Sequence, residues 1–206
     1  MDRLFNVIGL MSGTSGDGVD ASLTKTDGNN VFKSISDKYY EYPSLLKKKY
    51  HALVDKLKDL KDLNKFKADI DELERLLTIF NLEIIQDIKK NFKNNIDLIG
   101  YHGQTIYHNP KKKISRQLGN GNLLSKLLNI KIVYDFRKND ILNGGQGAPL
   151  TPIFHVMLSN KLNLNSAVIL NIGGILNATT IFEDGNFLAT DIGPGMCLID
   201  KWIRLN

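Results

Sequence analysis

The sequence is poor in cysteine and has no long apolar run. Its single cysteine, Cys197, excludes an internal disulfide, which is typical of a protein from a reducing compartment. No apolar run reaches the roughly 18 residues that a membrane-spanning helix needs. The first residues lack the apolar region and the small-residue cleavage site of a signal peptide. These absences predict a cytoplasmic protein with no membrane partner.

The positive charge of the chain raises nucleic acid as a partner. The 206 residues carry a formal net charge of +5. The lysines are spread along the chain, however, and between residues 56 and 75 they alternate with acidic residues, which indicates a solvated helical face. A hydrophobic content of 42% and a charged content of 24% are those of an ordinary globular protein. We therefore expect no nucleic-acid partner.

The apolar pattern predicts an α/β protein. Residues 4–11 form an apolar run closed by glycine and serine, and alternation over residues 19–24 indicates a second strand beyond a loop. Residues 44–92 have apolar spacings of three and four, which are typical of helices. A further strand over residues 96–108 runs into a glycine turn.

The pattern of strand, glycine-rich turn and alternating strand then recurs over residues 166–182. This recurrence predicts a complete first lobe over residues 1–165 and a second lobe, only begun, over residues 166–206. Three strands and a helix rarely form a stable layer alone. We therefore expect apolar side chains of the last helix to be unusually exposed, namely Leu198, Ile199, Trp202 and Ile203.

The loop over residues 12–20, "SGTSGDGVD", has three competing interpretations. Its glycines match the spacings of both the dinucleotide fingerprint and the phosphate loop, but each motif requires a following helix, and here a strand follows. A phosphate-cradling hairpin turn remains, with serine and threonine hydroxyls as donors and Asp17 facing a magnesium ion through water. An ordinary tight hairpin is the alternative. The recurrence of the pattern favours the phosphate turn.

Five segments in order resemble the anhydro-N-acetylmuramic acid kinases of the sugar kinase, Hsp70 and actin superfamily; they span residues 9–23, 100–110, 135–155, 170–181 and 190–202. The resemblance implies an actin-like (ribonuclease H-like) ATPase fold. It also implies an ATP- and Mg²⁺-dependent carbohydrate kinase of peptidoglycan turnover. Such a transferase converts 1,6-anhydro-N-acetylmuramic acid into N-acetylmuramic acid 6-phosphate while hydrolysing the anhydro ring.

The resemblance also implies roles for individual residues. Asp191 matches the general base that activates water. The second phosphate turn is Gly173 and Gly174. The first phosphate segment comprises Gly13, Thr14, Ser15, Gly16, Asp17, Gly18, Val19 and Asp20. Two positions depart from the family pattern. Gly16 replaces the usual leucine, which is expected to loosen the loop, and Met196 replaces the usual asparagine.

Four residues are candidate sugar contacts: His102, Gln104, Asp135 and Arg137. For Asp135 and Arg137 the alternative is a structural ion pair, and for His102 it is a satisfied structural histidine. His102 and His108 lack the spacing of a metal pair, and Cys197 has no second thiol nearby, so we expect no zinc site.

Members of the resembling family continue beyond the last residue of this chain, and that continuation carries most of the adenosine pocket. Two expectations follow beside the kinase function. The 206-residue chain by itself is a catalytically inactive fragment or a sugar-binding remnant. Its partners, besides the amino sugar and ATP, are a second copy in a homodimer or a separately encoded second lobe.

Overall fold

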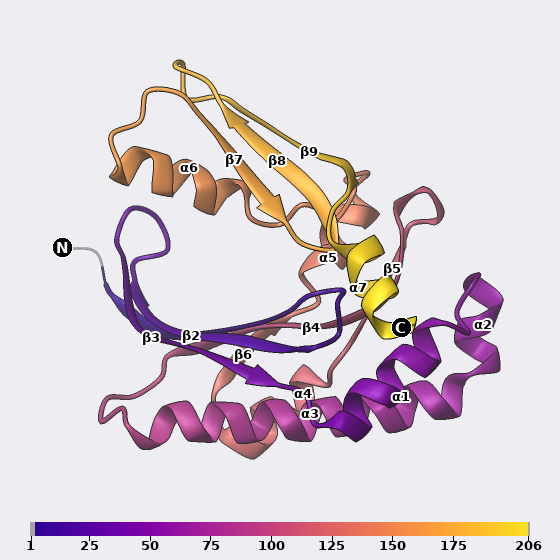
Figure 1. Ribbon diagram of the computed structural model, residues 1–206. Helices are drawn as coiled ribbons and strands as arrows, with labels where there is room; N and C mark the ends of the chain where they lie inside the picture. The colour runs from indigo at the N-terminus through magenta and orange to yellow at the C-terminus, as the bar shows by residue number, and fades with distance from the viewer. Residues whose placement is uncertain (1–2, 206) are drawn as a thin grey trace.

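The computed structural model describes residues 3–205, so residues 1, 2 and 206 of the two predicted lobes lie outside the described residues. In Figure 1 a three-stranded sheet lies above a larger sheet, whose far face is covered by helices α1, α3 and α4. The elements are β1 (Phe5–Ser12), β2 (Gly18–Thr26), β3 (Phe32–Glu41), α1 (Ser44–Val54), α2 (Leu60–Lys65), α3 (Lys67–Lys90), β4 (Leu98–Asn109), η1 (Pro110–Lys112), β5 (Ile114–Leu118), α4 (Gly121–Leu128), β6 (Lys131–Tyr134), α5 (Phe136–Leu142), α6 (Pro152–Lys161), β7 (Ala167–Ile172), β8 (Ile175–Ile181), β9 (Phe187–Pro194) and α7 (Cys197–Leu205).

The larger sheet confirms the predicted fold class. Its strands run in the order β3-β2-β1-β4, and both β5 and β6 pair with β4. Strands β1, β2 and β3 form an antiparallel meander, whereas β4 and β6 run parallel to β1 and to each other. This mixed sheet, with helices against one face, is an α/β arrangement. The α/β sequence pattern therefore predicted the correct class.

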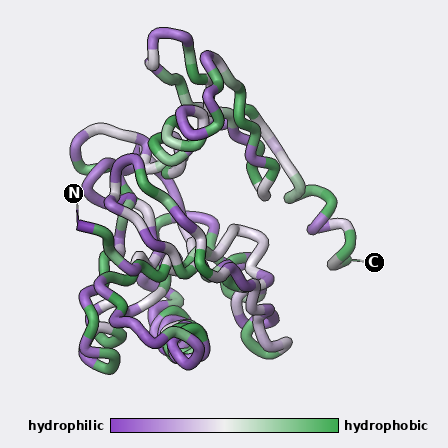
Figure 2. Tube along the Cα trace, turned by 90° about the vertical axis from the view of Figure 1, so that its left-hand side faces the viewer, coloured by the Kyte–Doolittle hydropathy of each residue, from purple (hydrophilic) through white to green (hydrophobic). Residues whose placement is uncertain are grey.

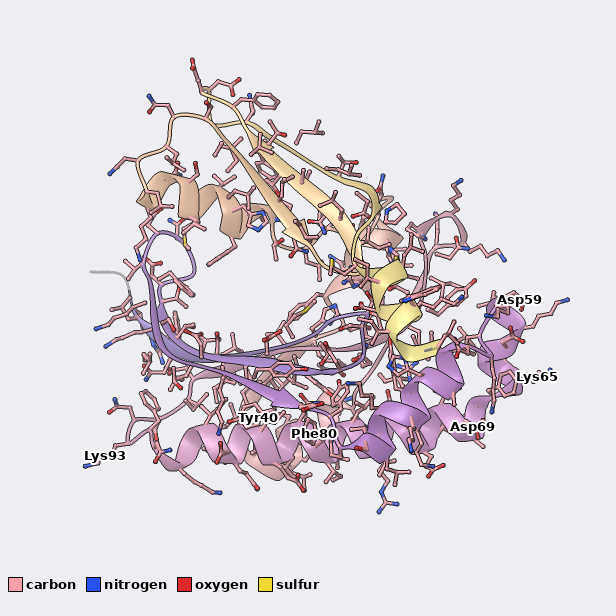
Figure 3. All side chains as sticks on the ribbon, in the orientation of Figure 1. Tyr40, Asp59, Lys65, Asp69, Phe80 and Lys93 are labelled. Atoms are coloured by element: carbon pink, nitrogen blue, oxygen red, sulfur yellow. The ribbon has the colours of Figure 1, made fainter. Side chains whose placement is uncertain are left out.

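The main core lies between this sheet and helix α3. The helix buries an apolar stripe with spacings of three and four, which includes Leu73, Leu77 and Ile84. Burying each such side chain stabilises the fold by about 1.5–3 kcal/mol. Figure 3 shows Tyr40 and Phe80 between the sheet and the helical layer, and both pack against the buried core.

The predicted helical region over residues 44–92 is divided into three helices. A break follows α1, and Asp59 then caps α2, because its side chain accepts a hydrogen bond from the backbone of Lys61 at 2.7 Å. The backbone of Asp59 donates in return to Asp62, which completes a capping box. The apolar spacing indicated helix correctly, but the capping box at Asp59 marks where α2 begins.

The second sheet has the order β7-β8-β9 and is antiparallel throughout, so the predicted recurrence of strand, turn and strand is confirmed. Helix α6 contacts it through a buried pair, in which His155 Nδ1 lies 2.8 Å from Thr179 Oγ1. Figure 2 shows α7 projecting away from the rest of the chain. Leu198, Trp202 and Ile203 are 66%, 69% and 68% exposed, as expected from the sequence.

No helix within residues 3–205 combines the length and the apolar character needed to cross a bilayer.

Candidate functional site

The turn between β1 and β2 is compact and held by its own polar groups. The backbone N–H of Gly16 donates to Gly13 O at 3.3 Å, and Ser15 Oγ donates to Asp17 Oδ1 at 2.7 Å. Gly16 has a φ of +64°, a conformation that favours glycine. Thr14 is exposed at the tip of the turn.

Tyr50 of helix α1 supports this turn from below. A Cβ atom at Gly16 would lie 1.9 Å from a carbon of the Tyr50 ring. The Tyr50 hydroxyl lies 3.3 Å from Thr14 O and 3.1 Å from Thr105 O. Gly16 was expected to loosen the loop. In the structure the tyrosine ring fills the space beside Gly16, so the turn is tightly packed there.

Gln104 of β4 supports the same turn from the sheet. Its Nε2 donates to Gly13 O at 2.8 Å, and its Oε1 accepts from Tyr42 at 3.0 Å. The Tyr42 hydroxyl also lies 3.1 Å from Ser12 Oγ, and burial raises the pKa of Tyr42, so that it stays protonated. Gln104 is only 1% exposed. These contacts favour a role in supporting the loop over a contact with sugar.

Two acids lie beside the turn and create a region of negative charge. Burial raises the pKa of Asp20, and the neighbouring charge of Asp17 raises it further. Burial and then Asp17 raise the pKa of Tyr39 to about 12. A carboxylate held by Ser15, with a second carboxylate nearby, fits a magnesium ion that keeps most of its waters. Within residues 3–205, no group of three or more His, Cys, Asp or Glu could hold a metal by itself.

The second glycine turn joins β7 to β8 and is braced by the segment after β9. The N–H of Gly195 donates to Gly174 O at 3.0 Å, and that of Met196 donates to Gly173 O at 2.8 Å. A Cβ atom at Gly195 would lie 2.2 Å from Gly173 O. Met196 therefore takes part through its backbone, and that contact does not depend on which side chain stands at the position.

The two glycine turns meet. A Cβ atom at Gly174 would fall 2.5 Å from Thr14 Oγ1, so the turns are in direct contact across the two sheets. Figure 1 shows the β1–β2 turn extending towards the β7–β8 turn and α7. This contact brings the hydroxyl of Thr14 beside the glycine backbone of the second turn, an arrangement that suits phosphate oxygens.

On the other side of the site, Arg137 of α5 is half-buried and held at both ends. Its Nη1 donates to Gly147 O at 2.6 Å, and its Nη2 and Nε lie 2.9 and 3.3 Å from His102 Nε2. The N–H of Gly147 in turn donates to Asp140 at 2.6 Å. The segment after α5 therefore folds back onto that helix and fixes the guanidinium.

His102 is neutral in this arrangement. Its Nδ1 lies 2.7 Å from the carbonyl of Gly103, which can only accept, so Nδ1 carries the proton and Nε2 accepts from Arg137. Burial, with the charge of Arg137, lowers the pKa of His102 to about 4.

The alternative of a structural ion pair between Asp135 and Arg137 is wrong. Asp135 has a φ of +60° and pairs instead with Lys138, one helical turn ahead, at 3.8 Å. Asp135 and His102 are among the lining residues of a cavity of about 310 Å³ between β5 and α5. Asp135 therefore remains a candidate for sugar contact, independent of Arg137.

Asp191 lies exposed on β9 and faces the first sheet. Its negative charge raises the pKa of Arg137 and of His108, against the larger lowering effect of burial at each. His108 also lies 2.9 Å from Ser115 Oγ. The sequence interpretation considered His108 only as a metal ligand. Its position six residues after His102 on one strand was the available signal that both approach the same site.

Comparison with protein families and with curated proteins decides the family of the chain. A family model described as anhydro-N-acetylmuramic acid kinase matches residues 5–206. The chain belongs to the anhydro-N-acetylmuramic acid kinase family. It is 48% identical to the anhydro-N-acetylmuramic acid kinase of Pelagibacter ubique over 99% of this chain and 55% of that protein.

A second anhydro-N-acetylmuramic acid kinase, from Agrobacterium fabrum, is 39% identical over 99% of this chain and 56% of its own length. The chain thus spans about half the length of the curated relatives it matches. Among solved structures, the Ppx/GppA family member of Aquifex aeolicus aligns with a TM-score of 0.41 at 10% identity, over 97% of this chain and 54% of that one.

Proposed function

We propose that this chain provides the phosphate-binding turns and the general base of an ATP-dependent kinase for 1,6-anhydro-N-acetylmuramic acid. The observation that carries the proposal is the contact of the two glycine turns at Thr14 and Gly174. Two turns that meet in this way can bind the phosphates of ATP from both sides. Asp17, oriented by Ser15, would hold Mg²⁺ through water, and the ion would neutralise phosphate charge.

Asp191 supplies the base in this proposal. Its carboxylate takes a proton from a water molecule, whose oxygen attacks the anomeric carbon of the sugar. The bond from that carbon to the 6-oxygen breaks, and the bonding electrons stay on the 6-oxygen. That oxygen then attacks the γ-phosphorus, and ADP leaves. The product is N-acetylmuramic acid 6-phosphate, which places the reaction in cell-wall recycling in the cytoplasm.

A second candidate is sugar binding without turnover. The contacts that hold Arg137, with His102 and Gly147, form without ATP, and they would support recognition of a sugar whether or not ATP is bound. Association, as a homodimer or with a separately encoded second lobe, would cover the exposed face of α7.

Two measurements separate these functions. Calorimetry on the 206-residue chain, with Mg-ATP and with the anhydro sugar, measures each binding event directly. Turnover is measured after joining the chain to the C-terminal remainder of the Pelagibacter ubique relative. Formation of ADP and the 6-phosphate supports the kinase. Sugar binding by the chain, with no turnover by the joined protein, would support the second candidate and reject the kinase.

A further inference from the structure

The guanidinium of Arg137 is held by hydrogen bonds, but some of its N–H donors have no acceptor among the described residues. Its contacts engage Nε, one N–H on Nη1 and one N–H on Nη2. A guanidinium has five N–H donors, so one donor remains on each Nη. Among residues 3–205, no group accepts from these two donors in the structure.

The charge of Arg137 also lacks a direct protein partner. Asp140, the acid on the same helix, is engaged with the N–H of Gly147. Asp191 acts on Arg137 through its charge, yet the two do not form an ion pair in the described part of the chain. A half-buried cation with one open donor on each terminal nitrogen is a suitable site for a carboxylate, which can accept both donors at once.

We propose that Arg137 binds the carboxylate of the sugar substrate and that His102 is the positioning residue that holds Arg137 for it. This inference rests on the proposed function, because the carboxylate is the lactyl group of 1,6-anhydro-N-acetylmuramic acid. His102 itself uses both ring nitrogens within the protein, one on Gly103 and one on Arg137, so it acts on the sugar only through Arg137.

Neutral histidine suits this role better than a charged one. If Nε2 carried a proton, it could not accept a hydrogen bond from Arg137. The charged imidazolium would also repel the positive guanidinium. The neutral ring accepts from two guanidinium nitrogens and leaves the positive charge of Arg137 available to the ligand. The carbonyl of Gly147, fixed through Asp140, restrains the other end.

Calorimetry with two sugars tests the inference on the chain as it exists. One is 1,6-anhydro-N-acetylmuramic acid, and the other is 1,6-anhydro-N-acetylglucosamine, which has the same ring and acetamido group but no lactyl carboxylate. We expect the wild type to bind the acid at least ~10-fold more tightly, as is typical for a charge-assisted bidentate contact. Arg137→Lys and His102→Leu should both reduce this preference to within about 2-fold.

Two controls make the result specific. His102→Gln keeps an acceptor for Arg137 and should retain part of the preference, which also covers the case in which His102→Leu fails to fold. Lys93→Gln removes one positive charge at the outer end of the helical layer, and it should leave both affinities unchanged (Figure 3).

Each other outcome is decisive. Equal affinity of the wild type for the two sugars would overturn the carboxylate site and leave the proposed kinase function standing. A preference lost in Arg137→Lys but kept in His102→Leu would reject the positioning role. Failure of the chain to bind either sugar, whether or not it binds Mg-ATP, would reject the carboxylate site and the sugar-binding part of the proposed function. Binding of Mg-ATP in that case would leave the phosphate-binding part standing.

Discussion

The side chain of Thr14 lies against the α-carbon of Gly174, so closely that a Cβ atom there would fall 2.5 Å from its hydroxyl oxygen. Thr14 belongs to the turn after β1, and Gly174 belongs to the turn after β7. Their contact joins the turns of the two sheets. Changes to either turn should therefore alter phosphate binding more than they alter the core.

Gly195→Ala should weaken Mg-ATP binding by at least ~10-fold, because a close overlap of this kind costs about 1–3 kcal/mol or displaces the backbone. The new Cβ would lie 2.2 Å from Gly173 O. Gly193→Ala is the matched control, since nothing lies within 4 Å of its Cβ position. Calorimetry on both variants measures the difference. Equal affinities of the two variants for Mg-ATP would show that the contacts of Gly195 and Met196 with the second glycine turn do not determine phosphate binding.

Gly16→Ala should lower the free energy of unfolding by at least ~2 kcal/mol, through its positive φ and its overlap with the ring of Tyr50. Tyr50→Phe keeps the ring and removes the hydroxyl, and it should cost about 1 kcal/mol. Gly9→Ala, where the space is open, should change stability by less than about 1 kcal/mol. Urea denaturation measures all three. A Gly16→Ala protein as stable as the wild type would contradict the observed packing.

The stability of the fold should fall in mild acid through His102. Its pKa is lowered from 6.5 to about 4, so between these values the unfolded chain binds a proton that the folded chain does not. The contribution of His102 to the free energy of unfolding is fully present above about pH 6.5. It falls by up to about 3 kcal/mol as the pH decreases towards 4. His102→Gln should flatten this pH dependence in thermal unfolding. An unchanged slope in the variant would assign the acid sensitivity to other groups.

Asp191→Asn should reduce turnover by at least ~100-fold in the chain joined to the C-terminal remainder of its relative, because the amide cannot accept the proton of water. Binding of Mg-ATP should be unchanged, since the substitution leaves the glycines of both turns in place. Asp184→Asn, which changes an acid in the β8–β9 turn, is the control and should retain activity. Full activity of Asp191→Asn would exclude it as the base.

The exposed apolar side chains of α7 should make the chain associate. Leu198, Trp202 and Ile203 form a surface of a kind that soluble monomers rarely leave uncovered. Light scattering should show a mass that rises with concentration, and Ile203→Lys should reduce the rise. Val31→Lys, at an exposed apolar position outside α7, should have no effect.

Amide hydrogens of residues 166–205 should exchange faster than those of residues 5–25. A monomer with uniform protection would contradict this prediction.

The sequence by itself determined the order of strands and helices, the recurrence of the glycine hairpin and the position of both glycine turns. These features are local: a strand has a period of two and a helix of 3.6, and a turn that needs glycine shows it within a few residues. The family motifs are local as well, so their order along the chain was sufficient to indicate the family.

Only the tertiary structure decided what each polar side chain contacts. Tyr50 beneath Gly16, Gln104 on Gly13 and His102 on Arg137 are pairs separated by many residues, and no periodicity relates them. Such partners are selected by how helices and sheets pack, because a buried donor or acceptor must find its hydrogen bond wherever the fold places one.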